Sequence, residues 1–388
     1  MFLEEAERLK ELPPYLFSEI DRIIGEKRAR GEDVISLGIG DPDIPTPQEI
    51  IDELYKAAKN PENHRYPSSY CLMLLKEAIA GYYKKRFNVE LDPESEIIPL
   101  WGSKEGIANV AYAFINPGDF VLVPDPGYLV YKIGTLFAGG ISHAMPILEK
   151  SNFLVDLDSI DEKVAKKAKI MHLNYPNNPT SANSSLNFFI KVTAFAIKYN
   201  ILVCHDNAYS EVYFDENNKP VSFLNATNSK EVGIEFNSFS KTFNMTGWRI
   251  GYAVGNRKVI ESLGKYKTNV DSGIFNAVQH AGVVALKDYS RHVKHNNYIY
   301  KKRRDIIYNA FNKLGIDYYK SNATIYIWVK VPKGYNSRSF AELLLNRANV
   351  VVTPGSAFGD YGEGYVRISI TLSDSRLEEA LERIKKVL

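Results

Sequence analysis

One lysine of the chain, Lys241, lies in a sequence context that suits covalent chemistry. It follows Ser238 and Ser240 in the string SFSKTFNMTGWRIGY, where apolar residues alternate with hydroxyl side chains. Burial among apolar groups lowers the pKa of an amine, and a deprotonated amine attacks carbonyl carbons to form imines. Arg249 stands eight residues after Lys241, so the same string offers hydroxyl donors and a cation, which together suit a phosphate. A lysine by itself is most often a surface charge, and only these neighbours distinguish Lys241.

Polar side chains follow two other apolar runs. Asp206 and Tyr209 come directly after the run at residues 201–204, and Asn178 follows the run at residues 170–173. A carboxylate at a strand end can hold a proton on a ring nitrogen through a charge-assisted hydrogen bond, although aspartate is also a common helix N-cap. Asparagine before proline is a general turn signal. On these residues alone, both the chemical and the structural interpretations stay open.

Three further groups could bind parts of a ligand. Ser103 and Lys104 precede the helical stretch 106–114, and the free amides of a helix start attract phosphate, although serine is also an ordinary N-cap. Tyr128 follows an apolar run and could stack on an aromatic ring. Arg367 lies on an alternating strand, where its guanidinium either grips a carboxylate with two hydrogen bonds or faces solvent.

Together these groups match what pyridoxal 5′-phosphate requires of a protein. The cofactor needs an amine that forms an imine, an anion at its pyridine nitrogen, donors for its phosphate and a platform for its ring. An amino-acid substrate also needs a cation for its carboxylate. Each requirement has a candidate among the residues named above, and Lys241 is the predicted anchor of the cofactor.

The elements that must position these residues form a repeating pattern. Between about residues 97 and 242, short apolar runs alternate with polar loops and helical stretches. The runs lie at residues 97–100, 120–123, 170–173, 201–204 and 235–238. Runs of this length between helices predict an α/β fold with buried strands in a mostly parallel sheet, which binds ligands beyond the carboxyl ends of its strands. Because the polar motifs follow the runs, we expect them to meet at that edge.

The chain is long enough for two domains. Its 388 residues exceed the roughly 250–300 at which a single hydrophobic core stops growing. Residues 1–31 read as helical, with an interrupting Pro-Pro pair. Further elements are expected as a strand at residues 34–37, a long helix at 277–314, strands at 326–331 and 366–370, and a final helix. We predict a large domain of residues 41–274 and a smaller α+β domain formed by residues 1–40 and 275–388.

Composition limits the classes of partner. The 48 basic and 46 acidic side chains leave a net charge of +2, which gives no electrostatic reason to expect nucleic acid as the partner. The cysteines are Cys71 and Cys204, too few for a disulfide framework, which indicates a reducing compartment. The polar start of the chain does not resemble a secretory signal. The sequence contains no run of about 18 apolar residues, so we expect no membrane span. We therefore expect a cytoplasmic protein.

The motifs strongly resemble those of the class I/II aminotransferases, which have the fold-type I architecture of pyridoxal-phosphate enzymes. The family signature is a serine-rich turn, a Schiff-base lysine and an arginine eight residues later, beside the patterns D-x-A-Y and N-P-[TG]. The resemblance extends from Leu12 to Arg367. Within the family the chain most resembles LL-diaminopimelate, alanine and archaeal-type aspartate aminotransferases. The strings LGIGDPD, from Leu37, and GSKEG, from Gly102, are similar to those of the diaminopimelate branch.

The resemblance implies a role in cofactor binding for most of the candidates. Lys241 would hold the pyridoxal phosphate, and Asp206 would keep its pyridine nitrogen protonated. Tyr209 and Asn178 would contact the phenolic oxygen of the cofactor, and Tyr128 would stack on its ring. The phosphate would be held by Ser103, Lys104, Ser238, Ser240, Arg249 and Tyr66 of the partner subunit. The resemblance thus implies a homodimer with shared active sites.

The implied reaction is a ping-pong transamination between an L-amino acid and a 2-oxo acid, expected to be 2-oxoglutarate. Arg367, helped by the backbone of Gly40 and by Asn178, would bind the substrate α-carboxylate. Dicarboxylate-specific relatives often carry an arginine in the neighbourhood that here holds Lys265 and Lys267. This difference favours a zwitterionic distal group, as in LL-diaminopimelate, over strict aspartate specificity.

Several alternatives remain at this level. The chain could be an aspartate or alanine aminotransferase, or a pyridoxal-phosphate lyase, decarboxylase or racemase on the same fold. A cofactor-binding transcription regulator would need an N-terminal winged-helix domain, and motifs that begin by residue 36 leave no room for one. The family also usually has glycine at the positions of Cys71 and Ser181 and proline at the position of Leu129.

Overall fold

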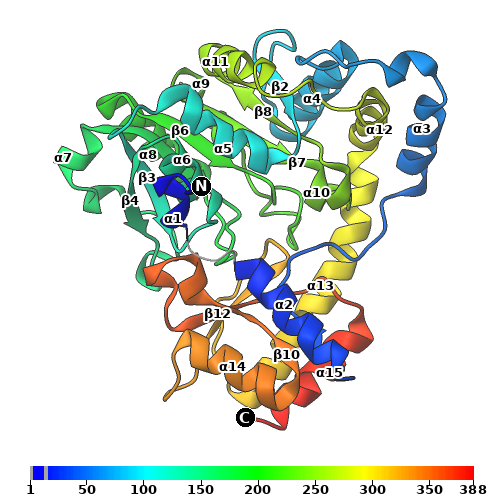
Figure 1. Cartoon of the computed structure of the whole chain (residues 1–388), viewed down its shortest axis with the longest axis vertical. Coiled ribbons are helices and arrows are strands. Elements are labelled where there is room, and N and C mark those ends of the chain that lie inside the picture. The colour runs from blue at the N-terminus through cyan, green and yellow to red at the C-terminus, as the bar shows by residue number, and fades with distance from the viewer. Residues whose placement is uncertain (1–2, 13–15) are drawn as a thin grey trace.

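The computed structural model describes residues 3–12 and 16–388 of the chain. Two lobes are visible in Figure 1, a larger one built on a broad sheet and a smaller one that contains the C-terminus. The long helix α13 (Tyr289–Leu314) runs from the larger lobe into the smaller one. The Pro-Pro pair expected to interrupt the first helical stretch lies outside the described residues. The stretch is helical on both sides, in α1 (Glu7–Lys10) and α2 (Leu16–Ala29).

A seven-stranded sheet with the order β2-β8-β7-β6-β5-β3-β4 forms the centre of the large lobe. Its strands are β2 (Ile97–Leu100), β3 (Phe120–Asp125), β4 (Ile141–Pro146), β5 (Ala168–Asn174), β6 (Leu202–Asp206), β7 (Gly233–Ser238) and β8 (Gly251–Gly255). The strands from β7 to β4 are parallel, and β8 runs antiparallel to both β7 and β2. The predicted mostly parallel α/β fold is therefore confirmed.

Two strands of this sheet were not among those expected from the sequence. Strand β4 lies at the sheet edge and is largely exposed or half-buried, so it lacks the continuous apolar run of a central strand. Strand β8 is buried but begins and ends with glycine, and it directly follows the lysine motif, so its strand character was hidden by the motif. Both strands are recognisable only from their pairing.

Helices cover both faces of the large sheet. Residues that alternate along the strands belong to two separate cores: Val203 packs on one face and Cys204 on the other. The first face is covered mainly by α4 (Met73–Phe87), α8 (Leu186–Tyr199) and α12 (Asn276–Lys287), and the second by α5 (Ser103–Phe114), α6 (Val130–Phe137) and α11 (Arg257–Thr268). Burial on both faces explains why the central strands are apolar at nearly every position.

The small lobe joins the two ends of the chain. A three-stranded antiparallel sheet has the order β11 (Thr353–Pro354), β12 (Tyr365–Ser369), β9 (Tyr326–Lys330). Beside it, β1 (Ile35–Ser36) pairs in parallel with β10 (Val350–Val351). The helices α14 (Ser337–Ala348) and α15 (Asp374–Lys385) pack on this lobe together with the second half of α13.

The long helix expected at residues 277–314 is two helices in the structure. Asp288 separates α12 from α13 because its backbone, at φ −119° and ψ 32°, leaves the helical region. Helix α12 packs against α3 (Gln48–Ala58) and α4 on the large-lobe side. The domain boundaries proposed from the sequence stay a prediction. Within residues 3–12 and 16–388, no helix has both the length and the apolarity needed to cross a membrane.

Candidate active site

A cavity of about 380 Å³ lies between the carboxyl ends of the large-sheet strands and the sheet of the small lobe. Every predicted site residue except Tyr66 lines it, so loops far apart in the sequence do meet at one place. The lining consists of Ile39, Gly40, Asp41, Gly102, Ser103, Lys104, Tyr128, Asn178, Asp206, Ala208, Tyr209, Ser238, Ser240, Lys241, Thr246, Arg249, Tyr326 and Arg367. The expected edge of the sheet is therefore where the polar motifs converge.

Lys241 belongs to α10 (Phe239–Thr242), a one-turn helix that follows β7. Ser238 begins this turn, and its hydroxyl accepts a hydrogen bond from the amide of Ser240 at 3.1 Å. The Lys241 amine donates to the carbonyl oxygen of Gly40 at 2.7 Å, which links the two lobes across the cavity. Burial lowers the pKa of Lys241, so a larger fraction of the amine is neutral and nucleophilic than in an exposed lysine.

Asp206 is the last residue of β6 and is 5% exposed. Its Oδ2 accepts a hydrogen bond from the Tyr131 hydroxyl at 2.9 Å, and its Oδ1 accepts one from the amide of Ala208 at 3.3 Å. Burial raises the pKa of the Asp206 carboxyl, and the hydrogen bond from Tyr131 opposes this shift. Tyr131, on α6, was not among the residues selected from the sequence.

Arg367 lies on β12 and is 1% exposed, so the alternative of a solvent-facing strand residue is wrong. Its Nη1 donates to Asn178 Oδ1 at 2.7 Å, and its Nη2 donates to the Gly38 carbonyl at 2.6 Å. The guanidinium also lies 4.2 Å from the centre of the Tyr326 ring, a cation–π contact. The fold therefore fixes the orientation of this cation.

Tyr326, on β9, is a cavity residue that sequence reasoning missed. Its hydroxyl is 3.0 Å from the hydroxyl of Tyr209, and burial raises the pKa of Tyr209 well above its usual range. A Cβ atom on Gly40 would lie 2.1 Å from the Tyr326 hydroxyl, so only glycine allows this close approach. Tyr326 starts the apolar strand YIWVK, which carries no signal except that of a buried strand.

The opposite end of the cavity is built from a helix start and an exposed arginine. Ser103 and Lys104 begin α5, and the residue before them, Gly102, has φ 79° and supplies no side-chain cap. This positive φ favours glycine, and a Cβ there would also lie 2.5 Å from Arg249 Nη2, so the arginine side chain would have to move. Arg249 is exposed and donates to the carbonyl of Thr246 at 2.9 Å. Two cations and a helix start make this end suitable for an anion.

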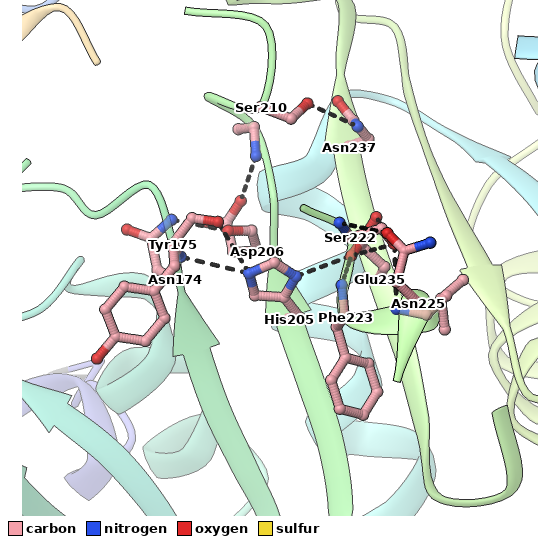
Figure 2. Close-up of polar contacts among 12 residues, drawn as sticks. Asn174, Tyr175, His205, Asp206, Ser210, Ser222, Phe223, Asn225, Glu235 and Asn237 are labelled. Atoms are coloured by element: carbon pink, nitrogen blue, oxygen red, sulfur yellow. Dashed lines mark hydrogen bonds and ion pairs between the residues drawn. The ribbon is translucent and has the colours of Figure 1, made fainter. Parts of the chain in front are cut away.

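Buried polar contacts tie β5, β6 and β7 together next to Asp206 (Figure 2). His205 Nδ1 is 2.9 Å from Glu235 Oε2, and His205 Nε2 is 3.0 Å from the carbonyl of Tyr175. Asn174 donates from Nδ2 to the Asp206 carbonyl at 2.8 Å and accepts from the Asn178 amide at 2.7 Å. The network holds the strand ends that present Asp206 and Asn178 at the cavity.

The three departures from the family pattern fit the local backbone. Ser181 and Cys71 have φ 65° and φ 62°, the left-handed region that favours glycine. Ser181 is held there because its hydroxyl donates to the Tyr326 carbonyl at 2.8 Å and accepts from Thr324 at 2.7 Å. Leu129 precedes α6 with φ −55°, which proline would also adopt. The chain thus keeps a glycine-type backbone at two non-glycine residues.

Tyr66 and Lys267 lie outside the cavity lining. The Tyr66 side chain is 90% exposed, so nothing within this chain shows its predicted role. Lys267 is fully buried, with its amine 2.5 Å from Asp271 Oδ2 and 3.6 Å from Glu105 Oε1. The charge of Lys267 is therefore neutralised inside the large lobe.

The geometry suits a flat ligand with an anionic tail beside a small carboxylate. Lys104 and Arg249 provide positive charges at one end, and Tyr128 provides an aromatic face. At the other end, the guanidinium of Arg367 can donate two parallel hydrogen bonds to a carboxylate. Lys241 lies in the same cavity with an amine of lowered pKa. A cluster of this kind can bind an amino acid by its carboxylate while an amine moves its protons.

Comparisons with known proteins agree with this arrangement. The family described as aminotransferase class I and II matches residues 32–384. LL-diaminopimelate aminotransferase of Moorella thermoacetica is 53% identical over 386 residues, which cover 100% of this chain and 99% of that protein. The enzyme of the same name from Aquifex aeolicus is 54% identical over 384 residues, which cover 99% of both chains.

Solved structures show the same fold. BacF of Bacillus subtilis, without ligand, has a TM-score of 0.96 and 40% identity, covering 100% of this chain and 98% of its own. A double mutant of Thermus thermophilus aspartate aminotransferase has a TM-score of 0.93 and 26% identity, covering 100% of both chains.

Proposed function

We propose that this chain, which belongs to the aminotransferase class I and II family, transfers the amino group of LL-diaminopimelate to 2-oxoglutarate with pyridoxal 5′-phosphate as its cofactor. Transamination itself follows from the family. The amino donor, the acceptor and the cofactor are our proposal. The observation that carries it is one cavity that contains an amine of lowered pKa, a buried carboxylate and a buried guanidinium: Lys241, Asp206 and Arg367.

The chemistry of the donor set supports pyridoxal phosphate. The phosphate fits the start of α5 together with Ser238, Ser240 and Arg249. Gly102 supports this assignment, because any side chain there would fill the space next to Arg249. When bound, the cofactor supplies an aldehyde that condenses with amines and a ring that withdraws electrons.

The chain itself holds and moves the protons. Asp206 keeps a proton on the pyridine nitrogen, since its carboxylate is the acidic group that ends β6 at the cavity. Arg367 binds the α-carboxylate of the amino acid and thereby fixes its Cα. The Lys241 amine then takes the α-proton as general base and returns it as general acid. Tyr209 and Asn178 donate hydrogen bonds to the phenolic oxygen of the cofactor.

The distal end of the substrate supports LL-diaminopimelate. Its far end carries both an ammonium and a carboxylate, so its binding does not require a single strong cation. The buried pairing of Lys267 with Asp271 removes one lysine that could have served a dicarboxylate substrate. The relatives that match over the full length, at 53% and 54% identity, carry the same name and support this donor.

The proposal includes a cytoplasmic homodimer with shared active sites. The exposed Tyr66 would reach the phosphate in the partner subunit, which accounts for an aromatic side chain left 90% in solvent. In such a dimer, residues of the partner subunit would cover the solvent-exposed end of the cavity, where Arg249 lies.

A panel of amino donors tests the function. The purified enzyme is mixed with 2-oxoglutarate and LL-diaminopimelate, aspartate, alanine, glutamate or an aromatic amino acid, and the new keto acid is measured. We expect kcat/KM to be highest with LL-diaminopimelate. A higher value with aspartate or alanine would refute the substrate and keep the transaminase. Decarboxylation or racemisation without 2-oxoglutarate would favour a lyase-type reaction instead.

The anchor is tested separately by borohydride reduction. Reduced and digested protein should carry its pyridoxyl label on the peptide that contains Lys241. A label on another peptide, or no label, would refute the assignment of the cofactor to this lysine.

A further inference from the structure

Tyr131 connects the carboxylate end of β6 with the aromatic residue expected to cover the ligand. It lies on α6, three residues after Tyr128, and is 1% exposed. Its hydroxyl donates to Asp206 Oδ2 at 2.9 Å, and its ring meets the Tyr128 ring edge-on, with centroids 6.1 Å apart at 90°. A single side chain therefore contacts both residues assigned to the pyridine ring.

The orientation of Tyr131 is fixed by its surroundings. Its ring stacks on His172 of β5 with centroids 5.0 Å apart and an interplanar angle of 17°. Burial lowers the pKa of His172 to about 3, so this neighbour is neutral and acts by packing. On the helix side, Thr135 donates to the Tyr131 carbonyl at 2.8 Å. The phenol hydroxyl consequently points at the carboxylate without a competing acceptor among these contacts.

The two oxygens of Asp206 have different partners. Oδ2 receives the Tyr131 hydroxyl, and Oδ1 receives the amide of Ala208 at the longer distance of 3.3 Å. An ionised carboxylate accepts about four hydrogen bonds, so it retains capacity for one from a protonated ring nitrogen. A phenol that donates to one oxygen sets the rotation of the carboxylate and stabilises its charge.

We propose that Tyr131 is a positioning residue of the reaction, which orients Asp206 and keeps it ionised so that it can hold the proton on the pyridine nitrogen of the cofactor. This inference rests on the proposed function. The role is specific, because a phenol that donates to a carboxylate affects only ligands that use this carboxylate. A purely structural tyrosine would affect every ligand of the cavity alike.

The experiment compares two forms of the cofactor on the cofactor-free full-length protein. One is pyridoxal phosphate and the other is its deaza analogue, in which a C–H group replaces the ring nitrogen. Dissociation constants are measured for the parent and for Tyr131→Phe, which keeps the ring that stacks on His172. We expect Tyr131→Phe to weaken pyridoxal phosphate about ten- to a hundredfold, the range of one hydrogen bond to a charged group, and to weaken the analogue less than about twofold.

Tyr308→Phe is the matched control. The Tyr308 hydroxyl donates to the Ser321 carbonyl at 3.3 Å and accepts from the Ser321 amide at 3.1 Å in the small lobe, so its loss removes the hydrogen bonds of a phenol away from the cavity. Neither form of the cofactor should lose affinity in this variant. Thermal unfolding of each cofactor-free variant reports whether the fold persists.

A double-mutant cycle tests whether Tyr131 acts through Asp206. In an Asp206→Asn background, Tyr131→Phe should have no further effect on pyridoxal phosphate binding. Equal losses for both cofactor forms, or unchanged affinity for pyridoxal phosphate, would overturn the role of Tyr131 and leave the proposed function intact. A parent protein that binds neither form would overturn the proposed function and this inference together.

Discussion

The two ends of the cavity each carry an arginine, and the two arginines are held very differently. Arg367 is 1% exposed and has hydrogen bonds of 2.7 Å and 2.6 Å to Asn178 and Gly38. Arg249 is exposed, has φ 55°, and donates to two backbone carbonyls, that of Thr246 at 2.9 Å and that of Trp101 at 3.3 Å. One cation is fixed by the fold and the other lies at the surface of the chain.

This contrast implies that the two ends of the cavity bind anions under different electrostatic conditions. A buried guanidinium acts in a medium of low dielectric constant, so its attraction for a carboxylate is strong and little affected by salt. An exposed guanidinium is screened by water and ions until something covers it. In our proposal the selective binding of the substrate takes place at the buried end, and the exposed end is completed by the phosphate and by the partner subunit.

The largest effect is expected at the lysine between the two ends. Lys241→Ala removes the amine that contacts Gly40 at 2.7 Å, and we expect kcat to fall at least about a thousandfold, within the range of general acid–base catalysis. Because burial lowers the pKa of Lys241, the neutral amine persists to a lower pH than in an ordinary lysine. Capture of pyridoxal phosphate by the parent should therefore fall only as the pH drops below this lowered pKa. Lys313→Ala, at an exposed lysine near the end of α13 that does not line the cavity, is the control and should keep full activity.

The second effect concerns the buried arginine. Arg367→Lys keeps the charge and removes the planar fork, so KM for every amino donor should rise about a hundredfold while affinity for pyridoxal phosphate changes little. The rise should be nearly the same at low and high salt. Arg376→Lys, in an exposed pair with Asp33 at 2.8 Å, controls for the substitution itself. An unchanged KM in Arg367→Lys would remove this residue from substrate binding.

The exposed arginine should give the opposite pattern. Arg249→Gln is expected to weaken pyridoxal phosphate about tenfold at low ionic strength and to leave KM for the amino donor nearly unchanged. The loss should shrink as salt is added, because the interaction is screened. Titration of the cofactor at two salt concentrations measures this. If Arg249→Gln and Arg367→Lys showed equal salt dependence, the contrast between the two ends would be wrong.

The smallest effect is expected from Tyr66. If this side chain completes the phosphate site of the partner subunit, Tyr66→Phe should weaken the cofactor about threefold, as for one neutral hydrogen bond. Tyr298→Phe is the control, since Tyr298 is 74% exposed and does not line the cavity. Light scattering should show a dimer for all variants. A monomeric parent protein would contradict the shared site.

The sequence was most informative about the position of a functional residue where that residue belongs to a short local motif. Asp206 ends an apolar run, and Lys241 follows a serine-rich turn, so the sequence places both at the carboxyl edge of a sheet. The strands β5, β6 and β7 then bring these motifs together, as the pattern of runs and loops predicted. Motifs of this kind are readable because their spacing is set by neighbouring residues in the chain.

Residues that reach the site from distant segments could not be found in this way. Tyr131 and Tyr326 are two of 25 tyrosines, and each lies in an apolar helix or strand with no motif of its own. Their roles depend on contacts across 75 residues to Asp206 and 117 residues to Tyr209. The break of the long helix at Asp288 was also missed, because a helical stretch looks continuous when one residue leaves the helical region.

By itself the sequence determined the strand–loop–helix order, the family, and the chemical types gathered at one edge of a sheet, since each follows from local spacing and from burial on two faces. Only the tertiary structure decided which arginine is buried, which phenol reaches the carboxylate, and that two non-glycine residues, Ser181 and Cys71, adopt left-handed backbone. The physical reason is that solvent exposure and hydrogen-bond partners are properties of the packed chain. A residue type fixes what a side chain can donate or accept, and the fold fixes what it meets.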